Sequence, residues 1–150
     1  MRHRLHVLAT IALAAVFAGG CAIARAANPA RTQVSGEITM AGPTLGSATF
    51  VPTECRSGDR AYFLGVDLTD ATTRDSVRLL VDPLTGSVVR AVRAGRGVAF
   101  EKSKCATFRA DLHETGWRVN RVRDVSGSLE LACVVEQEEI RADVRFEHCH

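Results

Sequence analysis

The sequence predicts an all-β protein, an antiparallel β-sandwich or small barrel, and three observations lead to that fold class. Apolar and polar residues alternate with a period of two in most segments of the second half and much of the first, as they do in half-buried strands. Turn-forming residues separate these segments at intervals of roughly 8 to 12 residues. No segment shows convincing helical periodicity, and the 70–75 segment has room for a single helical turn at most.

Short alternating segments follow one another along the chain. The expected strands cover residues 34–40, 48–51, 62–68, 77–81, 88–92, 98–100, 106–112, 117–119, 129–135 and 140–146. Gly36 interrupts the first strand, as at a β-bulge. The 82–86 segment is a strong turn because Pro83 presets φ and Gly86 permits a positive φ. We expect further turns at 93–97 and at 114–116.

The last two strands form the clearest hairpin of the sequence. Two sets of apolar residues each share one strand face: Leu129, Leu131, Cys133 and Val135, then Ile140, Ala142, Val144 and Phe146. Between them the charged residues 136–139 predict a four-residue loop, which places Val135 opposite Ile140. In this register Cys133 lies opposite Ala142, and Cys149 lies opposite Ser126.

Four cysteines predict two disulfides. They are Cys55, Cys105, Cys133 and Cys149, an even number without a C-x-x-C pair. The hairpin register separates Cys133 from Cys149 by about 23 Å, whereas a bridge needs Cα atoms within about 7 Å. This pairing is therefore disfavoured, and two patterns remain. We favour Cys55 with Cys133 and Cys105 with Cys149, because a four-strand meander over 105–149 brings its two ends together; the alternative is Cys55 with Cys149 and Cys105 with Cys133.

The N-terminus predicts export. Met1 to Arg4 is basic, and an apolar run follows from Leu5 to Ala18, too short to span a bilayer comfortably. We therefore divide the chain into a signal peptide (1–20), a tether (21–33) and a single β-sandwich domain (34–150). Removing residues 1–20 lowers the Lys and Arg count from 19 to 17, equal to the 17 Asp and Glu, so the net charge falls from +2 to 0. This balance gives no support for a nucleic-acid partner.

The residues Ala18-Gly19-Gly20-Cys21 resemble the end of a bacterial lipoprotein signal peptide, with Ala18 standing where Leu is usual. The resemblance implies cleavage before Cys21 and a diacylglyceryl group on its sulfur, so that the partner of the protein is a membrane, reached through a lipid anchor. Ala22 after the cysteine implies the outer membrane of the bacterial cell envelope. Ordinary secretory cleavage after 22–24 or 24–26, both of the A-x-A form, is the alternative and leaves a soluble secreted or periplasmic protein.

Two groups of residues are candidates for metal binding. His148 and His150 flank Cys149 at the C-terminus and share one strand face. The 67–75 segment holds three carboxylates that suit calcium, but it lacks the spacing and the central glycine of an EF-hand. We expect the terminal histidines to be exposed on a frayed C-terminus, and the 67–75 segment to be an ordinary polar turn. The sequence therefore predicts no metal and no cofactor.

A candidate anion-binding pair is formed by Arg121 and Arg123, close to the sole tryptophan, Trp117. Strand alternation places both guanidinium groups on one face, where they could grip a phosphate, an acidic sugar or a lipid headgroup. The competing interpretation is a solvated strand face, because Glu114, Asp124 and Glu130 are near in sequence, and this is the interpretation that we favour.

Catalytic motifs are absent from the sequence: there is no G-x-S-x-G elbow, H-E-x-x-H, Walker loop or S-x-x-K. His113 is the one histidine inside the expected domain and away from its C-terminus, so a Ser or Cys nucleophile would depend on it for a base. We therefore expect a non-enzymatic binding or structural domain whose further partner is an envelope protein or a glycan. The alternative is a small extracytoplasmic hydrolase or metal-dependent enzyme that uses His113 or the terminal histidines.

Overall fold

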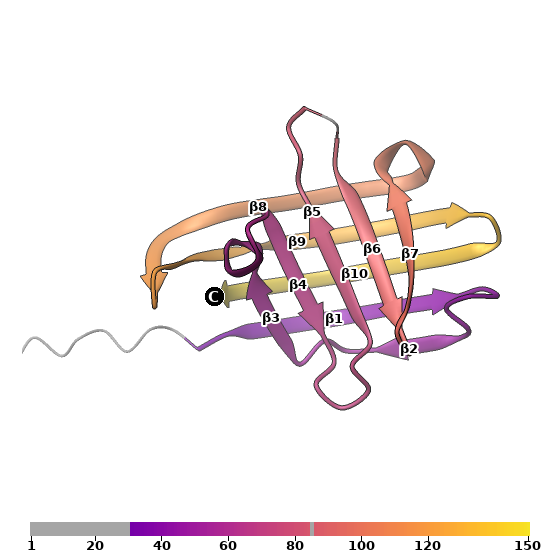
Figure 1. Ribbon diagram of the computed structural model, residues 1–150, viewed down its shortest axis with the longest axis horizontal. Coiled ribbons are helices and arrows are strands. Elements are labelled where there is room, and N and C mark those ends of the chain that lie inside the picture. The colour runs from indigo at the N-terminus through magenta and orange to yellow at the C-terminus, as the bar shows by residue number, and fades with distance from the viewer. Residues whose placement is uncertain (1–30, 85) are drawn as a thin grey trace, which may run out of the picture.

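Two antiparallel sheets of five strands each make up the protein in a computed structural model that describes residues 31–84 and 86–150 (Figure 1). The long sheet has the order β2-β1-β10-β9-β8, and the short sheet has the order β3-β4-β5-β6-β7. The strands of the long sheet are β1 (Gln33–Ala41), β2 (Ala48–Phe50), β8 (Cys105–Val119), β9 (Val122–Val135) and β10 (Glu138–Cys149). Those of the short sheet are β3 (Glu54–Ser57), β4 (Gly65–Thr69), β5 (Ser76–Leu80), β6 (Val88–Arg93) and β7 (Arg96–Glu101). Two 3-10 turns, η1 (Gly58–Ala61) and η2 (Lys102–Lys104), complete the described elements.

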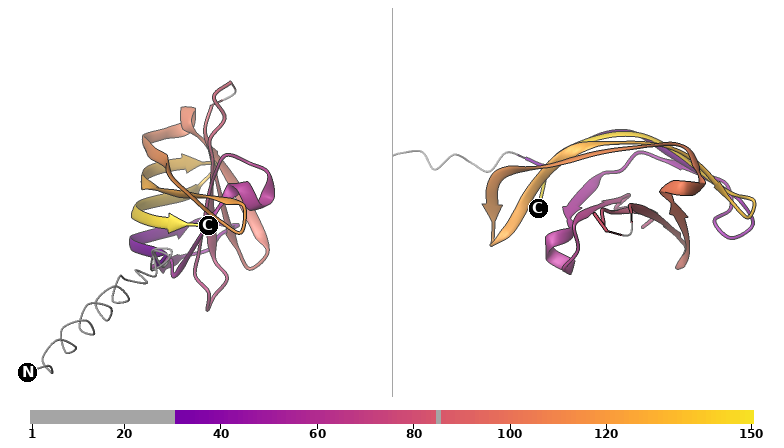
Figure 2. Two further views of the ribbon diagram at one scale, coloured as in Figure 1. Left: turned by 90° about the vertical axis from the view of Figure 1, so that its left-hand side faces the viewer. Right: turned by 90° about the horizontal axis from the view of Figure 1, so that it is seen from above.

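The long sheet curves over the short sheet, and the core lies between them (Figure 2). Alternate residues of each strand point inward, which is why the period-two pattern of the sequence marks the core. The long sheet contributes Ile38, Met40, Leu129, Leu131, Ile140, Val144 and Phe146, and the short sheet contributes Val66, Leu68, Val77, Leu79, Val89 and Phe100, all buried. The expected all-β sandwich is thus confirmed.

The β9–β10 hairpin is tighter than the sequence predicts. Val135 pairs with Glu138, and Cys133 pairs with Ile140, so the loop has two residues and the predicted four-residue loop is wrong. Glu136 and Gln137 both adopt a positive φ, of 49° and 70°, as a two-residue hairpin turn requires. As far as Phe146 the register differs from the predicted one by two residues, and the side chains from Ile140 to Phe146 therefore keep their predicted face.

The turn expected at 114–116 is absent, because β8 runs through it. The pairing of β8 with β9 shifts between Glu114 and Arg118, and Gly116 takes a φ of 85° at this irregularity. The chain reverses instead at Asn120 and Arg121, again with two positive φ values. Arg121 therefore lies in a turn and not in a strand.

The disulfides join Cys55 to Cys149 and Cys105 to Cys133. Exclusion of a bond between Cys133 and Cys149 is confirmed, but the pairing that we favoured, Cys55 with Cys133 and Cys105 with Cys149, is wrong. The 105–149 segment forms three strands and not four, so the start of β8 and the end of β10 lie at opposite ends of the sheet. Cys105 instead lies opposite Cys133 in the ladder, and Cys55 on β3 meets the end of β10 with its Cα 5.1 Å from that of Cys149.

The two bonds have different structural roles. Cys55–Cys149 links the short sheet to the long sheet, whereas Cys105–Cys133 links two neighbouring strands of the long sheet. Paired cysteines fit a protein of an oxidising, extracytoplasmic compartment. In residues 31–84 and 86–150, no helix has the length and apolarity needed to cross a membrane. The predicted signal peptide, Cys21 and all but the last three residues of the tether lie outside the described residues.

Candidate functional site

A cavity of about 520 Å³ that is open to solvent and lined mostly by polar residues lies on the long sheet, over β8, β9 and β10. Its wall contains carboxylates, hydroxyls, imidazoles and a guanidinium group. The lining residues are Asp111, His113, Thr115, Ser126, Gly127, Ser128, Arg145, Phe146, Glu147 and His148. His113, the internal histidine of the sequence, and His148, from the C-terminal pair, thus line one cavity.

Strand pairing brings these polar side chains together. Asp111 lies opposite Ser128, His113 lies opposite Ser126, and Arg145 of β10 also lies opposite Ser128. Asp111, Ser128 and Arg145 are therefore cross-strand neighbours on β8, β9 and β10, on the face opposite the core. Gly127 permits the close packing of β8 on β9 here, since a Cβ atom at this position would lie 1.9 Å from the backbone oxygen of Asp111.

A buried carboxylate, Asp124, lies beside the cavity. It is only 2% exposed and accepts hydrogen bonds at Oδ2 from the Thr115 hydroxyl at 2.6 Å and from Nδ1 of His148 at 2.8 Å. An ionised carboxylate accepts hydrogen bonds only, so Nδ1 of His148 carries the proton and Nε2 is left as the basic nitrogen. Asp124 thereby fixes the tautomer of a cavity-lining imidazole.

The other oxygen of Asp124 has no hydrogen-bond partner among the described residues. Nδ1 of His150 lies 3.8 Å from this Oδ1 atom, too far for a hydrogen bond, and is itself buried without a partner. Buried polar atoms in proteins are almost always paired, so two neighbouring exceptions mark a place where hydrogen-bonding capacity remains unused.

A β-bulge turns His148 toward Asp124. The pairing of β10 with β9 shifts between Phe146 and Cys149, and His148 within this bulge has a φ of 56°. Its backbone N–H donates to the Ser126 hydroxyl at 3.1 Å. The terminus is therefore held by a hydrogen bond, a disulfide and an ion pair, and the expected frayed end with solvent-exposed His148 and His150 is wrong. Bulges near sheet ends commonly redirect one side chain in this way.

No metal centre is visible in the part of the chain that the structure describes: it holds no group of three His, Cys, Asp or Glu side chains that could bind an ion. Cys149, the remaining candidate ligand beside the two histidines, is in a disulfide.

The carboxylates of the 67–75 segment have separate partners and do not converge. Asp67 binds Arg78, Asp75 is buried and lies 3.4 Å from Arg93, and Asp70 accepts from the Thr72 N–H within its own loop. This last hydrogen bond, more than any other contact, lowers the pKa of Asp70 below its usual value. The segment is a polar turn, as the sequence led us to expect.

Arg121 and Arg123 are not brought together as a pair. Arg121 is exposed in the β8–β9 turn, whereas Arg123 contacts Asp59 of η1 at 3.0 Å and Glu114 at 2.8 Å. The hydrogen bonds from Arg123, first from its backbone N–H and then from its side chain, lower the pKa of Asp59, and the bonds with Asp59 and Glu114 raise the pKa of Arg123. Arg123 thus fastens η1 to the long sheet.

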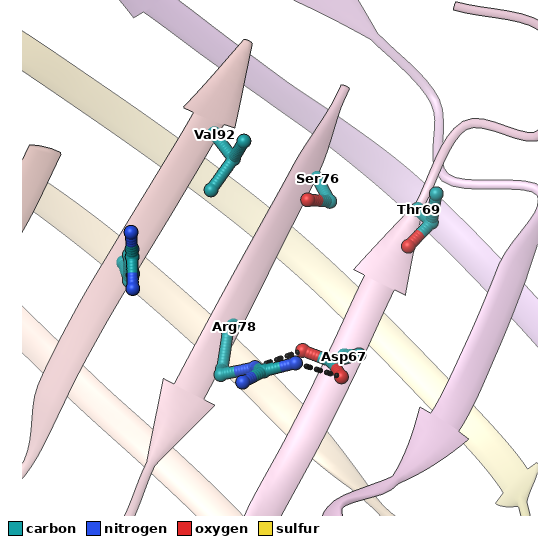
Figure 3. Close-up of a pocket in the computed structure, with 6 residues that line it drawn as sticks. Asp67, Thr69, Ser76, Arg78 and Val92 are labelled. Carbon is teal, nitrogen blue, oxygen red and sulfur yellow. Dashed lines mark hydrogen bonds and ion pairs between the residues drawn. The ribbon is translucent and has the colours of Figure 1, made fainter. Parts of the chain in front are cut away.

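A second, smaller cavity of about 270 Å³ lies on the short sheet (Figure 3). Figure 3 shows Arg78 and Asp67 pointing toward one another, with both carboxylate oxygens bonded to the guanidinium group at 2.6 and 2.8 Å. This pairing raises the pKa of Arg78 further and satisfies Asp67. Unlike Asp124, the carboxylate of this cavity has no unused oxygen, and the long-sheet cavity is the better candidate site.

Sequence reasoning identified His113 and His148 but missed Asp124 and Thr115. The available signal was the segment Val122-Arg123-Asp124-Val125-Ser126, in which a strand places Asp124 and Ser126 on one face.

Comparison of the chain with protein-family models, curated proteins and solved structures found no match. The class of the protein is thus defined by its own structure: a two-disulfide antiparallel β-sandwich with a polar cavity on its long sheet.

Proposed function

We propose that the protein is an exported cell-envelope binding domain that holds a hydroxyl-rich ligand, a glycan, in the cavity of the long sheet. The observation that carries this proposal is the lining of that cavity, where hydrogen-bonding side chains of three strands face one open space. Sugars present many hydroxyl groups that both donate and accept. Ser, Thr, Asp, His and Arg side chains match such groups.

The charge of the lining favours a neutral ligand over an anionic one. Asp111 and Glu147 supply two carboxylates, and Arg145 is the one guanidinium group in the lining. A strongly anionic ligand would meet repulsion from the two carboxylates, and like charges disfavour binding. Behind the wall, Asp124 holds the cavity-lining imidazole of His148 in place through its Oδ2 atom.

A titration followed by NMR tests this function. Soluble oligomers of N-acetylglucosamine and of neutral hexoses are added to the protein, and we expect amide shifts confined to residues 111–115, 126–128 and 145–148. Ser128→Ala should weaken binding about tenfold, the effect of about 1.4 kcal/mol. Ser76→Ala, in the cavity of the short sheet, is the matched control and should leave the Kd unchanged. Shifts centred on the short sheet, or none with any oligomer, would refute the assignment.

Lipid anchoring through Cys21 is the second part of the proposal. The basic and apolar start of the chain and the Gly-Gly-Cys sequence support it, and the two disulfides fit the extracytoplasmic location. We propose the outer membrane as the site of attachment. Intact mass of the protein from native membranes should show cleavage before Cys21 and a lipid-sized increment on that residue; a free N-terminus at Arg25 or Ala27 contradicts it.

A hydrolytic function is the second candidate, favoured by the Asp124–His148 pair. A carboxylate that holds Nδ1–H of a histidine leaves Nε2 able to take a proton from an attacking water, as in the base and orienter of hydrolytic triads. Release of p-nitrophenol from p-nitrophenyl acetate measures such an activity. His148→Ala should slow it by at least about a hundredfold, whereas His113→Ala should have a smaller effect. Equal rates in the protein and in His148→Ala would remove this candidate.

A further inference from the structure

One end of the sandwich gathers exposed aromatic side chains. This end carries the start of β1, η1, the β8–β9 turn and the C-terminus, at the left in Figure 1 and facing the viewer in the left panel of Figure 2. Tyr62, which follows η1, is 99% exposed, and Trp117, near the β8–β9 turn, is 58% exposed. Tyr and Trp are the side chains that favour the interface between water and lipid.

The exposure of Tyr62 is imposed by the backbone. Its φ of 61° lies in the left-handed region, which is unusual for a bulky residue. Its N–H donates to the backbone oxygen of Asp59, and Arg123 holds the side chain of Asp59. Residues held in sparsely populated backbone regions cluster at ligand clamps and other functional sites.

Four exposed arginine side chains lie at the same end as these aromatic residues. Arg31, Arg60, Arg118 and Arg121 are exposed at this end and form no ion pair with any residue that the structure describes. Acidic groups also lie at this end: Asp59 and Glu114 are both bound by Arg123, and Glu147 lies opposite Gln33, the first residue of β1. The composition is that of a surface that adsorbs to anionic headgroups: guanidinium groups beside interfacial aromatic rings.

The proposed anchor would bring this same end to the membrane. Cys21 precedes Gln33, the first residue of β1, by 12 residues, which span at most about 40 Å when fully extended. The start of β1 lies at the same end of the molecule as the β8–β9 turn (Figure 1). A lipid on Cys21 therefore restricts this end, more than the opposite one, to the neighbourhood of the bilayer surface.

We propose that this end of the sandwich, the membrane-facing end, rests on the anionic phospholipid surface in which the Cys21 lipid is inserted. Trp117 and Tyr62 enter the headgroup region, and the four arginines contact lipid phosphates. The proposal rests on lipidation of Cys21, which belongs to the proposed function. A diacylglyceryl group carries two acyl chains and therefore anchors the protein firmly, and basic residues beside it add attraction to an anionic surface.

The sole tryptophan of the chain reports this contact directly. The mature lipid-bearing protein is reconstituted in vesicles of phosphatidylglycerol and phosphatidylethanolamine, and the emission of Trp117 is compared with that on vesicles of phosphatidylcholine. We expect a shift to shorter wavelength and quenching by brominated lipid on the anionic vesicles. Arg118→Glu/Arg121→Glu should abolish both effects. Arg109→Glu/Arg141→Glu, with the same change of charge in exposed positions away from this end, should retain them.

Sedimentation of the vesicles separates the two hypotheses. If the protein sediments with the vesicles but its Trp117 emission is unchanged, the membrane-facing end does not contact the lipid, and only the lipid anchor on Cys21 is supported. Protein that carries no lipid and stays in the supernatant overturns the anchor and, with it, this inference. An emission shift that appears without vesicles and grows with protein concentration assigns the surface to a second copy of the chain and also overturns the inference.

Discussion

Each end of the β9–β10 hairpin buries a carboxylate, and the two carboxylates differ in how completely their oxygens are hydrogen-bonded. Glu138, at the turn, is 4% exposed and accepts backbone N–H groups of Thr44 and, at 3.1 Å, of Leu45. Asp124, at the other end, keeps one oxygen without a hydrogen-bond partner among the described residues, with Nδ1 of His150 3.8 Å away. A buried carboxylate whose two oxygens both accept hydrogen bonds has a structural role. A buried carboxylate with one oxygen that accepts none still has hydrogen-bonding capacity for another group.

The bonds of Glu138 also determine its titration. Burial is the largest single influence and raises its pKa, but the bonds from Thr44 and Leu45 and the positive charge of Arg96 together outweigh burial, so that the pKa of Glu138 lies below its usual value. The ionised form is therefore the one that the fold prefers. It ties the β1–β2 loop to the β9–β10 hairpin at the end of the molecule away from the candidate site.

The largest expected effect comes from opening the bond between the sheets. Cys55→Ala/Cys149→Ala should lower the free energy of unfolding by about 4 to 5 kcal/mol, because the closed loop spans 94 residues. Cys105→Ala/Cys133→Ala, which opens a span of 28 residues, should cost about 3 to 4 kcal/mol. Denaturant titration measures both.

Cys149 adjoins His148, so loss of its bond should loosen the Asp124 end first. Hydrogen exchange in Cys55→Ala/Cys149→Ala should rise more in residues 122–126 than in residues 133–140. Equal loss of protection at both ends of the hairpin would show that the Cys55–Cys149 bond does not stabilise the Asp124 end in particular.

A smaller effect is expected from Glu138→Gln, which keeps the size of the side chain but removes the charge that accepts two N–H groups. We expect a fall of several degrees in Tm at pH 7 and no change in ligand binding. Glu139→Gln, at the neighbouring position, where the pair with Arg141 is exposed, is the matched control and should leave Tm nearly unchanged. A Tm equal to that of the control would show that Glu138 is not a structural carboxylate.

The pH dependence of this effect follows from the lowered pKa of Glu138. Its stabilisation is fully present above the unfolded pKa, near 4.5, and is lost as the pH falls through the lower folded pKa. The difference in free energy of unfolding between the protein and Glu138→Gln should therefore shrink below about pH 4.5. A difference that stays constant down to pH 2.5 would contradict the assignment.

The smallest change in stability is expected from Asp124→Asn. Removing a buried charge lowers its desolvation cost, which offsets the weaker bonds to Thr115 and His148, so the free energy of unfolding should change by less than about 1.5 kcal/mol. Oligosaccharide binding should nevertheless weaken about tenfold. NMR titration and denaturant unfolding of one sample measure both quantities, and a large loss of stability with unchanged binding would reverse the roles assigned to Asp124 and Glu138.

The period-two pattern of the sequence correctly predicted which residues of the strands face the core. Inward positions such as Leu131 and Val144 alternate with polar residues, and a period of two survives a register error of two, so the core faces were right although the loop length was wrong. The β9–β10 turn was missed because Glu136 and Gln137 adopt a positive φ without the Gly or Asn that normally marks it. The β8–β9 turn carries one such residue, Asn120, but Gly116 four residues earlier suggested a turn at the wrong place.

The candidate site depends on contacts that local pattern does not contain. Asp124 becomes buried because a bulge 24 residues later turns His148 toward it, and no residue type in the sequence announces that bulge. The disulfide pattern failed for a related reason. A strand expected to end at Leu112 continues to Val119, so the number of strands after Cys105, and hence the end at which β10 finishes, was miscounted.

The nesting of the disulfides also constrains how the protein acquires them. A chain synthesised from its N-terminus presents Cys55 and then Cys105, yet the native bonds enclose one pair within the other, Cys105–Cys133 inside Cys55–Cys149. Joining the cysteines in order of appearance therefore yields two wrong bonds, which only thiol–disulfide exchange can correct. Maturation of this sandwich thus depends on an isomerising step or on oxidation delayed until all four thiols are present, so a strong oxidant alone should trap it misfolded.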